Sequence, residues 1–393
     1  MKYDFDQVLN RDNLSTSKWE MEISRKQNKN LLCFGTADMD FKSSEPIIQS
    51  LRKVVENGHF GYPFKRESYY QAVIGWFERH CGWKIEKEWI ANGVSIYPSF
   101  QGLIEGLSSE GDEVIYNTPV HHIFAEIVQA TKRVAVENPL KIVDGRYEID
   151  FDDLEQKMTE RTKLFILCNP HNPVGRVWTR EELQRLMDIC LKHNVIVIAD
   201  EVYFDLVHKG YKYTPIASLS KEASMSTVTC ISPSKTFNLT GIKHSLVITE
   251  NKEFYRIYKD EQKNNEYYGE SIFGHAATEA AFGESDEWLE QLVDYVEENY
   301  RLVRDFAEEN LPGVNVCHPE ATYFVWMDFS CLGLNDEGLT AFFEDEAQVI
   351  VTQGCHLVTG GQGFIRLNVG CPRSILKEGL ERIKETFQRF MPE

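Results

Sequence analysis

The sequence predicts an α/β protein with a mainly parallel central sheet flanked by helices, followed by a smaller α+β part. Short β-rich runs alternate with amphipathic helical patterns between residues 113 and 231. Such alternation is typical of parallel sheets, because a helix must carry the chain back before the next parallel strand can begin. From residue 286 the pattern opens with a helix, continues with a β segment and closes with a helix over 373–390. We therefore expect a boundary between two domains near residue 285.

The expected strands of the central sheet are short and rich in β-branched and aromatic residues. They cover 113–116, 163–168, 195–199 and 227–231. A helix is expected over 179–193, where Thr179 stands three residues before Glu182. That spacing is typical of a capping box, in which each side chain bonds the backbone amide of the other residue.

Charge and composition exclude several classes of function. The chain has 393 residues, with 42 Lys and Arg against 61 Asp and Glu, which gives a formal net charge of −19. Such a surface repels nucleic acid and anionic lipid, so we expect neither as a partner. No apolar run approaches the roughly 18 residues of a membrane span, and the N-terminal segment lacks the apolar core of a signal peptide. We therefore expect a soluble, cytoplasmic protein with a sizeable core.

Cysteine and histidine spacing gives no sign of a disulfide framework or a metal site. The nine cysteines lie far apart and none has CxxC spacing. The eleven histidines form no HExxH pattern. We therefore expect reduced thiols and no bound metal.

Polar clusters follow three of the expected strands directly. The segments 169–175, 200–203 and 232–238 hold Asn, Asp, Tyr, Ser and Lys side chains where the strands end. In open α/β sheets, ligands bind beyond the carboxyl ends of the strands. One such cluster would carry little weight, but three in this order favour a single shared site.

The residue types at these strand ends indicate a particular chemistry. Lys235 in a desolvated pocket can lose its proton and act as an amine nucleophile. Asp200 can hold a positive charge on a heterocyclic nitrogen, and the Ser232 hydroxyl with nearby amides can receive a phosphate. Each residue alone also fits a structural role, since an Asp after a strand is often a helix N-cap and Ser-Pro-Ser is often a turn. Their co-occurrence favours the chemical interpretation.

A series of motifs spans nearly the whole chain. They are Arg11 with Lys18-Trp19, Ala37-Asp-Met-Asp-Phe41, Phe60-Gly-Tyr-Pro63, Cys168-Asn-Pro-His-Asn-Pro-Val-Gly175, Ala199-Asp-Glu-Val-Tyr203, Pro233-Ser-Lys-Thr-Phe-Asn238 and Phe364-Ile-Arg-Leu-Asn368. In this order they resemble the class I/II aminotransferase superfamily of fold-type I enzymes, which depend on pyridoxal 5'-phosphate (PLP). Within it, the chain looks most like the cystathionine β-lyases and related C–S lyases of the MalY/PatB type. The resemblance implies a large PLP-binding domain over 46–285 and a small domain formed by 1–45 and 286–393.

The resemblance also implies a role for each matching residue. Lys235 would bind PLP covalently and then move the substrate α-proton, and Asp200 would pair with the protonated ring nitrogen. Asn172 and Tyr203 would hydrogen-bond the phenolic oxygen of the ring. The implied catalytic residues are Lys235, Asp200 and Tyr203; the implied cofactor-binding residues are these three with Asn172, Ser232, Ser234, Lys243, Ile96, Tyr97, His121 and Tyr62.

Substrate binding and assembly follow from the same resemblance. Arg366 would clamp the substrate α-carboxylate, with Asn172 and Ala37 beside it. Tyr62 would reach the cofactor phosphate of a neighbouring subunit, which implies a homodimer. Structural alternatives stay open: Tyr62 can be a packing aromatic, Lys243 a solvated lysine, and Arg366 can face solvent from an alternating strand.

Two positions depart from the pattern of this branch. His121 stands where the family commonly has a tyrosine stacked on the cofactor ring, and Ser95 replaces a glycine in the loop beside the phosphate. Imidazole can still stack, but it ordinarily titrates near neutral pH. We therefore expect an altered cofactor environment, while Lys235, Asp200 and Asn172 preserve PLP binding.

The resulting hypothesis is β-elimination of a thiol from a sulfur amino acid such as cystathionine, giving pyruvate and ammonia. The alternative is an aminotransferase that moves the amino group of an L-amino acid to a 2-oxo acid, because both reactions begin with the same α-proton transfer. A role as a regulator that binds another protein has no support in a surface feature of the sequence. A nicotinamide-binding enzyme is disfavoured because no GxGxxG follows a strand.

Overall fold

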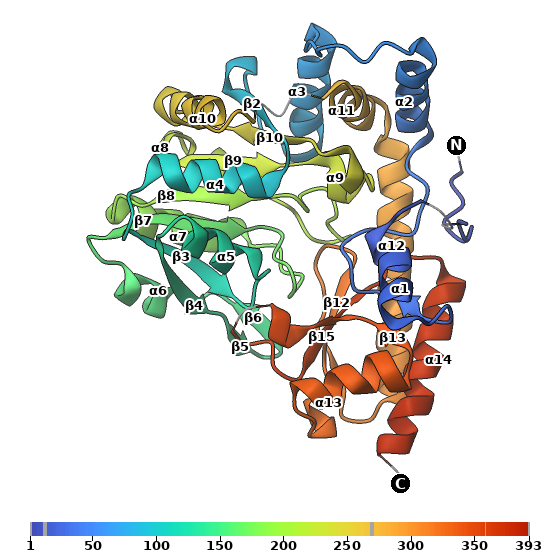
Figure 1. Ribbon diagram of the computed structural model, residues 1–393. Helices are drawn as coiled ribbons and strands as arrows, with labels where there is room; N and C mark the ends of the chain where they lie inside the picture. Colours follow the sequence, from blue (N-terminus) through green and yellow to red (C-terminus); the bar gives the residue numbers. More distant parts are fainter. Residues whose placement is uncertain (1, 11–13, 268–270, 358, 392–393) are drawn as a thin grey trace.

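The structure is a computed structural model that describes residues 2–10, 14–267, 271–357 and 359–391. Figure 1 shows a large sheet with helices around it and a second, smaller sheet beside the C-terminal helices. Arg11, one of the motif residues, lies outside the described residues. In the described part of the chain, no helix is both long and apolar enough to cross a membrane.

The large sheet has seven strands, and all of its pairings are parallel except the two made by β10. The four predicted strands are confirmed, each within two residues of the expected ends, and three further strands are added, two at one edge and one at the other. In spatial order the strands are β2 (Ile90–Gly93), β10 (Ser245–Ile248), β9 (Thr227–Ile231), β8 (Ile196–Asp200), β7 (Thr162–Cys168), β3 (Glu113–Thr118) and β4 (Val134–Pro139).

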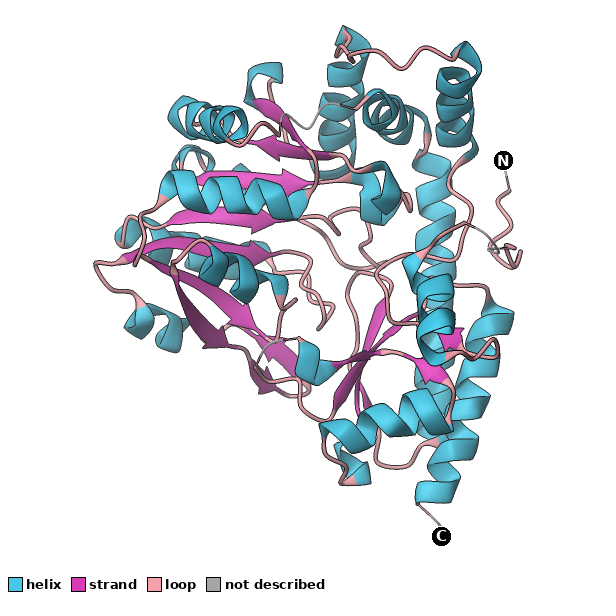
Figure 2. Ribbon diagram, in the orientation of Figure 1, coloured by secondary structure: helices cyan, strands magenta, loops and turns pink. Residues whose placement is uncertain are grey.

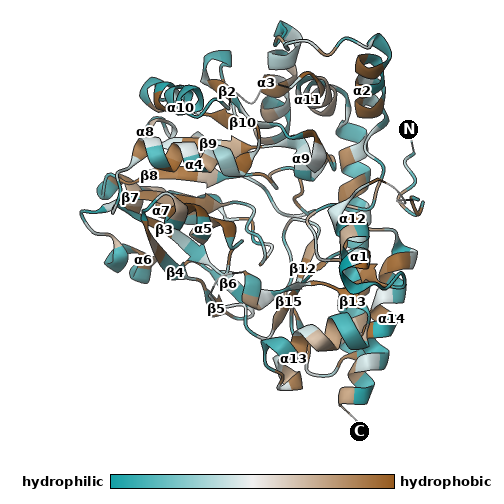
Figure 3. Cartoon of the chain, in the orientation of Figure 1, coloured by the Kyte–Doolittle hydropathy of each residue, from teal (hydrophilic) through white to brown (hydrophobic). Residues whose placement is uncertain are grey.

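Helices cover both faces of this sheet, which explains why its strands are apolar throughout. In β7, Leu164 and Ile166 pack into the core shared with α4, whereas Phe165 and Leu167 pack into the core shared with α7. A strand buried on both faces needs apolar residues at every position, and Figure 3 shows these strands as mostly hydrophobic. The helices around the sheet are α2 (Glu45–Asn57), α3 (Glu67–Cys81), α4 (Ile96–Leu107), α5 (Ile123–Ala130), α6 (Phe151–Lys157), α7 (Arg180–Lys192), α8 (Lys221–Met225), α9 (Pro233–Thr236), α10 (Lys252–Asn264) and α11 (Ile272–Glu284).

The predicted capping box at the start of α7 is confirmed. The Thr179 Oγ1 accepts from the Glu182 amide at 3.2 Å, and the Glu182 carboxylate accepts from the Thr179 amide at 2.7 Å. Two otherwise unpaired amide groups are thereby satisfied, which fixes where the helix begins.

The smaller sheet is antiparallel and lies beside the long helix that begins at residue 286, as Figure 2 shows. Its central strands bring Arg366 opposite Trp326 on one side and Thr352 on the other. The division into two domains at residue 285 remains a prediction. In sheet order its strands are β11 (Asn315–Val316), β12 (Phe324–Asp328), β15 (Phe364–Asn368) and β14 (Thr352–Gln353). The helices of this part are α12 (Asp286–Asn310), α13 (Asp336–Ala341) and α14 (Arg373–Phe390). The other helix and strands are α1 (Glu22–Lys26), the parallel pair β1 (Leu32–Cys33) and β13 (Val349–Ile350), and the hairpin β5 (Lys141–Val143) and β6 (Arg146–Glu148).

A buried ion pair ties the N-terminal segment to the chain that follows β1. The Lys18 Nζ lies 3.0 Å from the Asp40 carboxylate, and both side chains are 1% exposed. The same Nζ donates to the Asp38 carbonyl at 2.9 Å. Removing one partner of such a pair leaves the other charge buried without compensation. The pair therefore gives a physical reason for the Lys18 and Ala37–Phe41 motifs.

We predict that Lys18→Met lowers the free energy of unfolding by about 3–5 kcal/mol, because the Asp40 carboxylate stays buried without its cation. Lys26→Met serves as the matched control, since Lys26 pairs with Glu344 and Asp345 at the surface, where such pairs contribute less than about 1 kcal/mol. Urea unfolding followed by circular dichroism measures both losses. Equal losses in the two variants would contradict the importance of the buried pair.

Candidate active site

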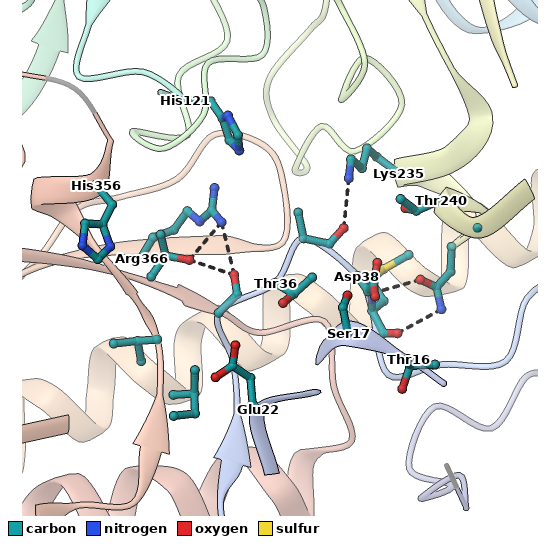
Figure 4. Close-up of a pocket in the computed structure, with 18 of the residues that line it drawn as sticks. Thr16, Ser17, Glu22, Thr36, Asp38, His121, Lys235, Thr240, His356 and Arg366 are labelled. Atoms are coloured by element: carbon teal, nitrogen blue, oxygen red, sulfur yellow. Dashed lines mark hydrogen bonds between the residues drawn. The ribbon is translucent and has the colours of Figure 1, made fainter. Parts of the chain in front are cut away.

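A hollow of about 130 Å³ lies at the carboxyl ends of β7, β8 and β9, and it shares lining residues with a larger cavity of about 1040 Å³ between the two sheets. Figure 4 shows Lys235, His121 and Arg366 converging on the same space from three separate segments. Most of the predicted site residues meet here. The smaller hollow is lined by Ala37, Ile96, Tyr97, His121, Asn172, Asp200, Tyr203, Ser232, Ser234, Lys235 and Lys243.

Asp200 places a carboxylate deep in the smaller hollow. It is the last residue of β8 and is 8% exposed. Within the described residues, one hydrogen bond reaches its side chain, from the Val202 amide at 3.3 Å. Burial raises the pKa of Asp200 to about 7, and the positive charge of Lys235 opposes that rise. A buried carboxylate with so few donors is suited to receive a cationic ligand group.

Lys235 approaches the same hollow from α9, directly after β9. The Ser232 Oγ begins this turn, accepting from the Ser234 amide at 3.1 Å and donating to the His244 carbonyl at 2.6 Å. The Lys235 Nζ donates to the Ala37 carbonyl at 3.1 Å. Desolvation lowers the pKa of Lys235 to about 8, although the Asp38 carboxylate opposes the change. A substantial fraction of this amine is therefore neutral and nucleophilic near pH 8.

The opposite end of the hollow is suited to an anion. Helix α4 begins there, and its first residues, Ile96 and Tyr97, line the hollow with the N-cap residue Ser95. The first amides of a helix have no partner within the helix and carry partial positive charge. Lys243 is exposed, but it lines both the hollow and the larger cavity, so its charge is available to a ligand.

His121 occupies the wall of the hollow as a neutral ring. Burial lowers the pKa of His121 to about 3, and the Arg366 charge lowers it further. His121 therefore departs from an ordinary imidazole, because desolvation and a nearby cation both disfavour its charged form. Its ring centroid lies 4.4 Å from that of His122, with 25° between the planes, and 5.9 Å from that of Tyr97.

Arg366 is held rigidly in the wall of the larger cavity. It is 3% exposed, so the alternative of a solvent-facing arginine is wrong. Its guanidinium donates to the Asn172 Oδ1 at 2.9 Å and the Thr352 Oγ1 at 3.1 Å, and it lies over the Phe324 ring at 4.0 Å. These contacts fix the orientation of the Arg366 guanidinium, which is a planar and permanently charged donor with one side toward the cavity.

Tyr62 is the predicted site residue that does not join the others. Its side chain is fully exposed, and it lines neither hollow of its own chain. The alternative of a packing aromatic is therefore wrong within one chain. In the described residues, no group of His, Cys, Asp and Glu side chains is arranged to hold a metal ion.

Several cavity residues were not predicted from the sequence. Thr240 lines both hollows, and Cys168 and His244 line the smaller one. His122 also lines the larger cavity beside His121. Cys168 could have been predicted as a lining residue, because it is the last residue of β7 and ligands bind beyond the carboxyl ends of such strands. The other three lie on turns whose course depends on tertiary packing.

Comparisons with known proteins agree with this geometry. Residues 34–383 match the family described as aminotransferase class I and II. The chain is 37% identical to cystathionine beta-lyase PatB of Bacillus subtilis over 381 residues, which cover 97% of this chain and 98% of that protein. It is 29% identical to protein MalY of Escherichia coli, over 96% of this chain and 97% of that protein.

Solved structures give the same result. Cystalysin from Treponema denticola, which contains pyridoxal 5'-phosphate, superposes with a TM-score of 0.97 at 32% identity, over the whole of both chains. The PLP-bound C–S lyase from Staphylococcus hominis has a TM-score of 0.91 at 30% identity, over 98% of each chain. The chain therefore belongs to the class I and II aminotransferase family and, within it, to the branch of cystathionine β-lyases and C–S lyases.

Proposed function

We propose that this protein is a PLP-dependent C–S β-lyase that eliminates a thiol from a sulfur amino acid such as cystathionine, giving pyruvate and ammonia. The observation that carries the proposal is that the buried Asp200 carboxylate and the Lys235 amine line one hollow together with the N-terminus of α4. The similarity to PatB and to the C–S lyase from Staphylococcus hominis supports the choice of reaction.

The residues present fit PLP at each of its polar ends. The cofactor has a cationic ring nitrogen, an aldehyde and a phosphate, which require a carboxylate, an amine and an anion site. Asp200, Lys235 and the start of α4 with Lys243 supply these three groups around the same hollow. Asn172 and Tyr203 line the hollow between them, where they would hydrogen-bond the ring oxygen.

Each residue then has a chemical task in the proposed reaction. Bound PLP supplies an electron sink that makes the substrate α-proton acidic. Arg366 would bind the substrate α-carboxylate through two parallel hydrogen bonds, which fixes the α-carbon relative to Lys235. The neutral Lys235 amine would remove the α-proton as a general base. Asp200 would keep its negative charge beside the ring nitrogen, where a cation stabilises it.

An assembly is part of the proposal. Tyr62, together with Phe60 and Phe64, forms an exposed aromatic segment before α3. Exposed apolar side chains gathered in one segment favour a protein interface. We propose that a second copy covers this segment and that Tyr62 reaches the partner's phosphate site. Sedimentation velocity tests this, and a monomer at micromolar concentration would contradict it.

A cytoplasmic location is also proposed. None of the nine cysteines forms a disulfide in the structure; five of them are buried and four are partly buried. Free thiols in this number are typical of proteins kept in a reducing compartment.

The first prediction of the proposal concerns pyruvate. The PLP-loaded protein, given L-cystathionine without a 2-oxo acid, should release pyruvate over many turnovers, because elimination needs no amino acceptor. A coupled lactate dehydrogenase assay measures the release. Lys235→Ala should abolish it together with the absorbance of lysine-bound PLP. A substrate-induced spectral change without pyruvate would instead support the aminotransferase alternative.

The second prediction concerns substrate affinity. Arg366→Lys should raise KM for cystathionine by roughly thirtyfold or more, equivalent to about 2 kcal/mol or more, because an ammonium cannot form the paired hydrogen bonds of a guanidinium. Arg146→Lys is the matched control, since Arg146 pairs with Glu320 away from the cavity. An unchanged KM in Arg366→Lys would remove Arg366 from carboxylate binding.

A further inference from the structure

The carbonyl of Ala37 accepts two hydrogen bonds inside the site. The Lys235 Nζ donates to it at 3.1 Å, a contact drawn in Figure 4. The Tyr323 hydroxyl donates to it at 3.0 Å from the opposite element, just before β12. Tyr323 is 1% exposed and lines neither hollow, so it does not contact a bound substrate directly. It contacts the site through this carbonyl.

The chain around Ala37 cannot easily turn this carbonyl elsewhere. The Asn368 Nδ2 donates to the carbonyls of Thr36 and Asp38, both at 2.7 Å. Asn238 bonds both the amide and the carbonyl of Met39, at 3.1 and 2.9 Å. Side chains from β15 and from the segment after α9 therefore hold the residues on either side of Ala37, and Tyr323 holds the carbonyl itself.

Tyr323 also contacts a second residue of the site. Its ring meets that of Tyr203 edge to face, with centroids 5.9 Å apart and 74° between the planes. Tyr203 lines the smaller hollow beside Asp200. Tyr323 thus contacts Tyr203 through its ring, and its hydroxyl contacts the carbonyl that accepts from Lys235. Packing alone would be served equally by phenylalanine at this position.

We propose that Tyr323 is a positioning residue for proton transfer by Lys235, an inference that rests on the proposed role of Lys235 as the base. The Tyr323 hydroxyl fixes the Ala37 carbonyl as the acceptor for the Lys235 amine whenever that amine is not bonded to the cofactor. When the neutral amine takes the α-proton, the substrate C–H bond breaks, an N–H bond forms, and the electron pair stays with the substrate. The carbonyl then holds the resulting ammonium at the same place.

The test isolates proton transfer from elimination. L-Alanine deuterated at the α-carbon has no leaving group, so loss of its deuterium to solvent, followed by proton NMR, reports the Lys235 step alone. Tyr323→Phe keeps the ring and should slow this exchange about tenfold, the effect of one neutral hydrogen bond. The alanine concentration that gives half the maximal exchange rate should stay within about twofold of the wild-type value, as should the PLP dissociation constant from equilibrium dialysis.

Tyr116→Phe is the matched control, because it also removes a buried hydroxyl, one that has no hydrogen-bond partner among the described residues. It should exchange at the wild-type rate. Exchange by Tyr323→Phe within about twofold of wild type, or an equal fall in Tyr116→Phe, would overturn the proposal. Failure of the wild-type protein to bind PLP or to exchange at all would instead overturn the proposed function.

Discussion

The structure depends on one geometric constraint: the carboxyl ends of β7, β8 and β9 open at the same edge of the large sheet. Polar groups at that edge lie above a core buried on both faces, so water does not satisfy them freely. The pKa of Asp200 rises and that of Lys235 falls for the same reason, which is desolvation. The Asp200 carboxylate therefore favours a cationic partner, and the Lys235 amine is available as a nucleophile. A ligand with a cationic ring and an aldehyde would meet both requirements.

The segment that follows β1 makes the second half of the site rigid. Lys18 and Asn368 of β15 both donate to the Asp38 carbonyl, and Asn368 also donates to that of Thr36. Lys235 and Tyr323 share the Ala37 carbonyl. The N-terminal segment, helix α9 and the small sheet all contribute to these contacts. Arg366 is fixed in the same way by Asn172 and Thr352, so the groups proposed to bind substrate and to move its proton are held by one network.

Much of this arrangement could be predicted from the sequence. The four central strands, the capping box at Thr179 and the meeting of Asp200 with Lys235 follow from hydrophobic pattern and from the rule that parallel strands share an edge. The orientation of Arg366 could not be predicted, because an alternating strand has two equivalent faces until its neighbours are known. The low pKa of His121 depends on burial by distant segments. Strand β10 was missed because its antiparallel pairing needs no helical crossover.

The role of Tyr323 was beyond sequence reasoning for a related reason. It acts through a backbone carbonyl, and the identity of Ala37 carries no information about where that carbonyl points. Tyr62 shows the opposite case, since its motif was recognisable but its side chain is fully exposed and lines neither hollow of its own chain. Residues that act at the end of one strand can therefore be predicted from the sequence, whereas residues that act through a second segment cannot.

The measurement that tests the central claim most directly is the location of the bound cofactor. Sodium borohydride reduction of the PLP-loaded protein would fix any lysine-bound PLP as a stable amine, and peptide mass spectrometry would locate it. We predict a single modified peptide that carries the label on Lys235. Label on another lysine, or none after saturation with PLP, would contradict the assignment of this hollow as the active site.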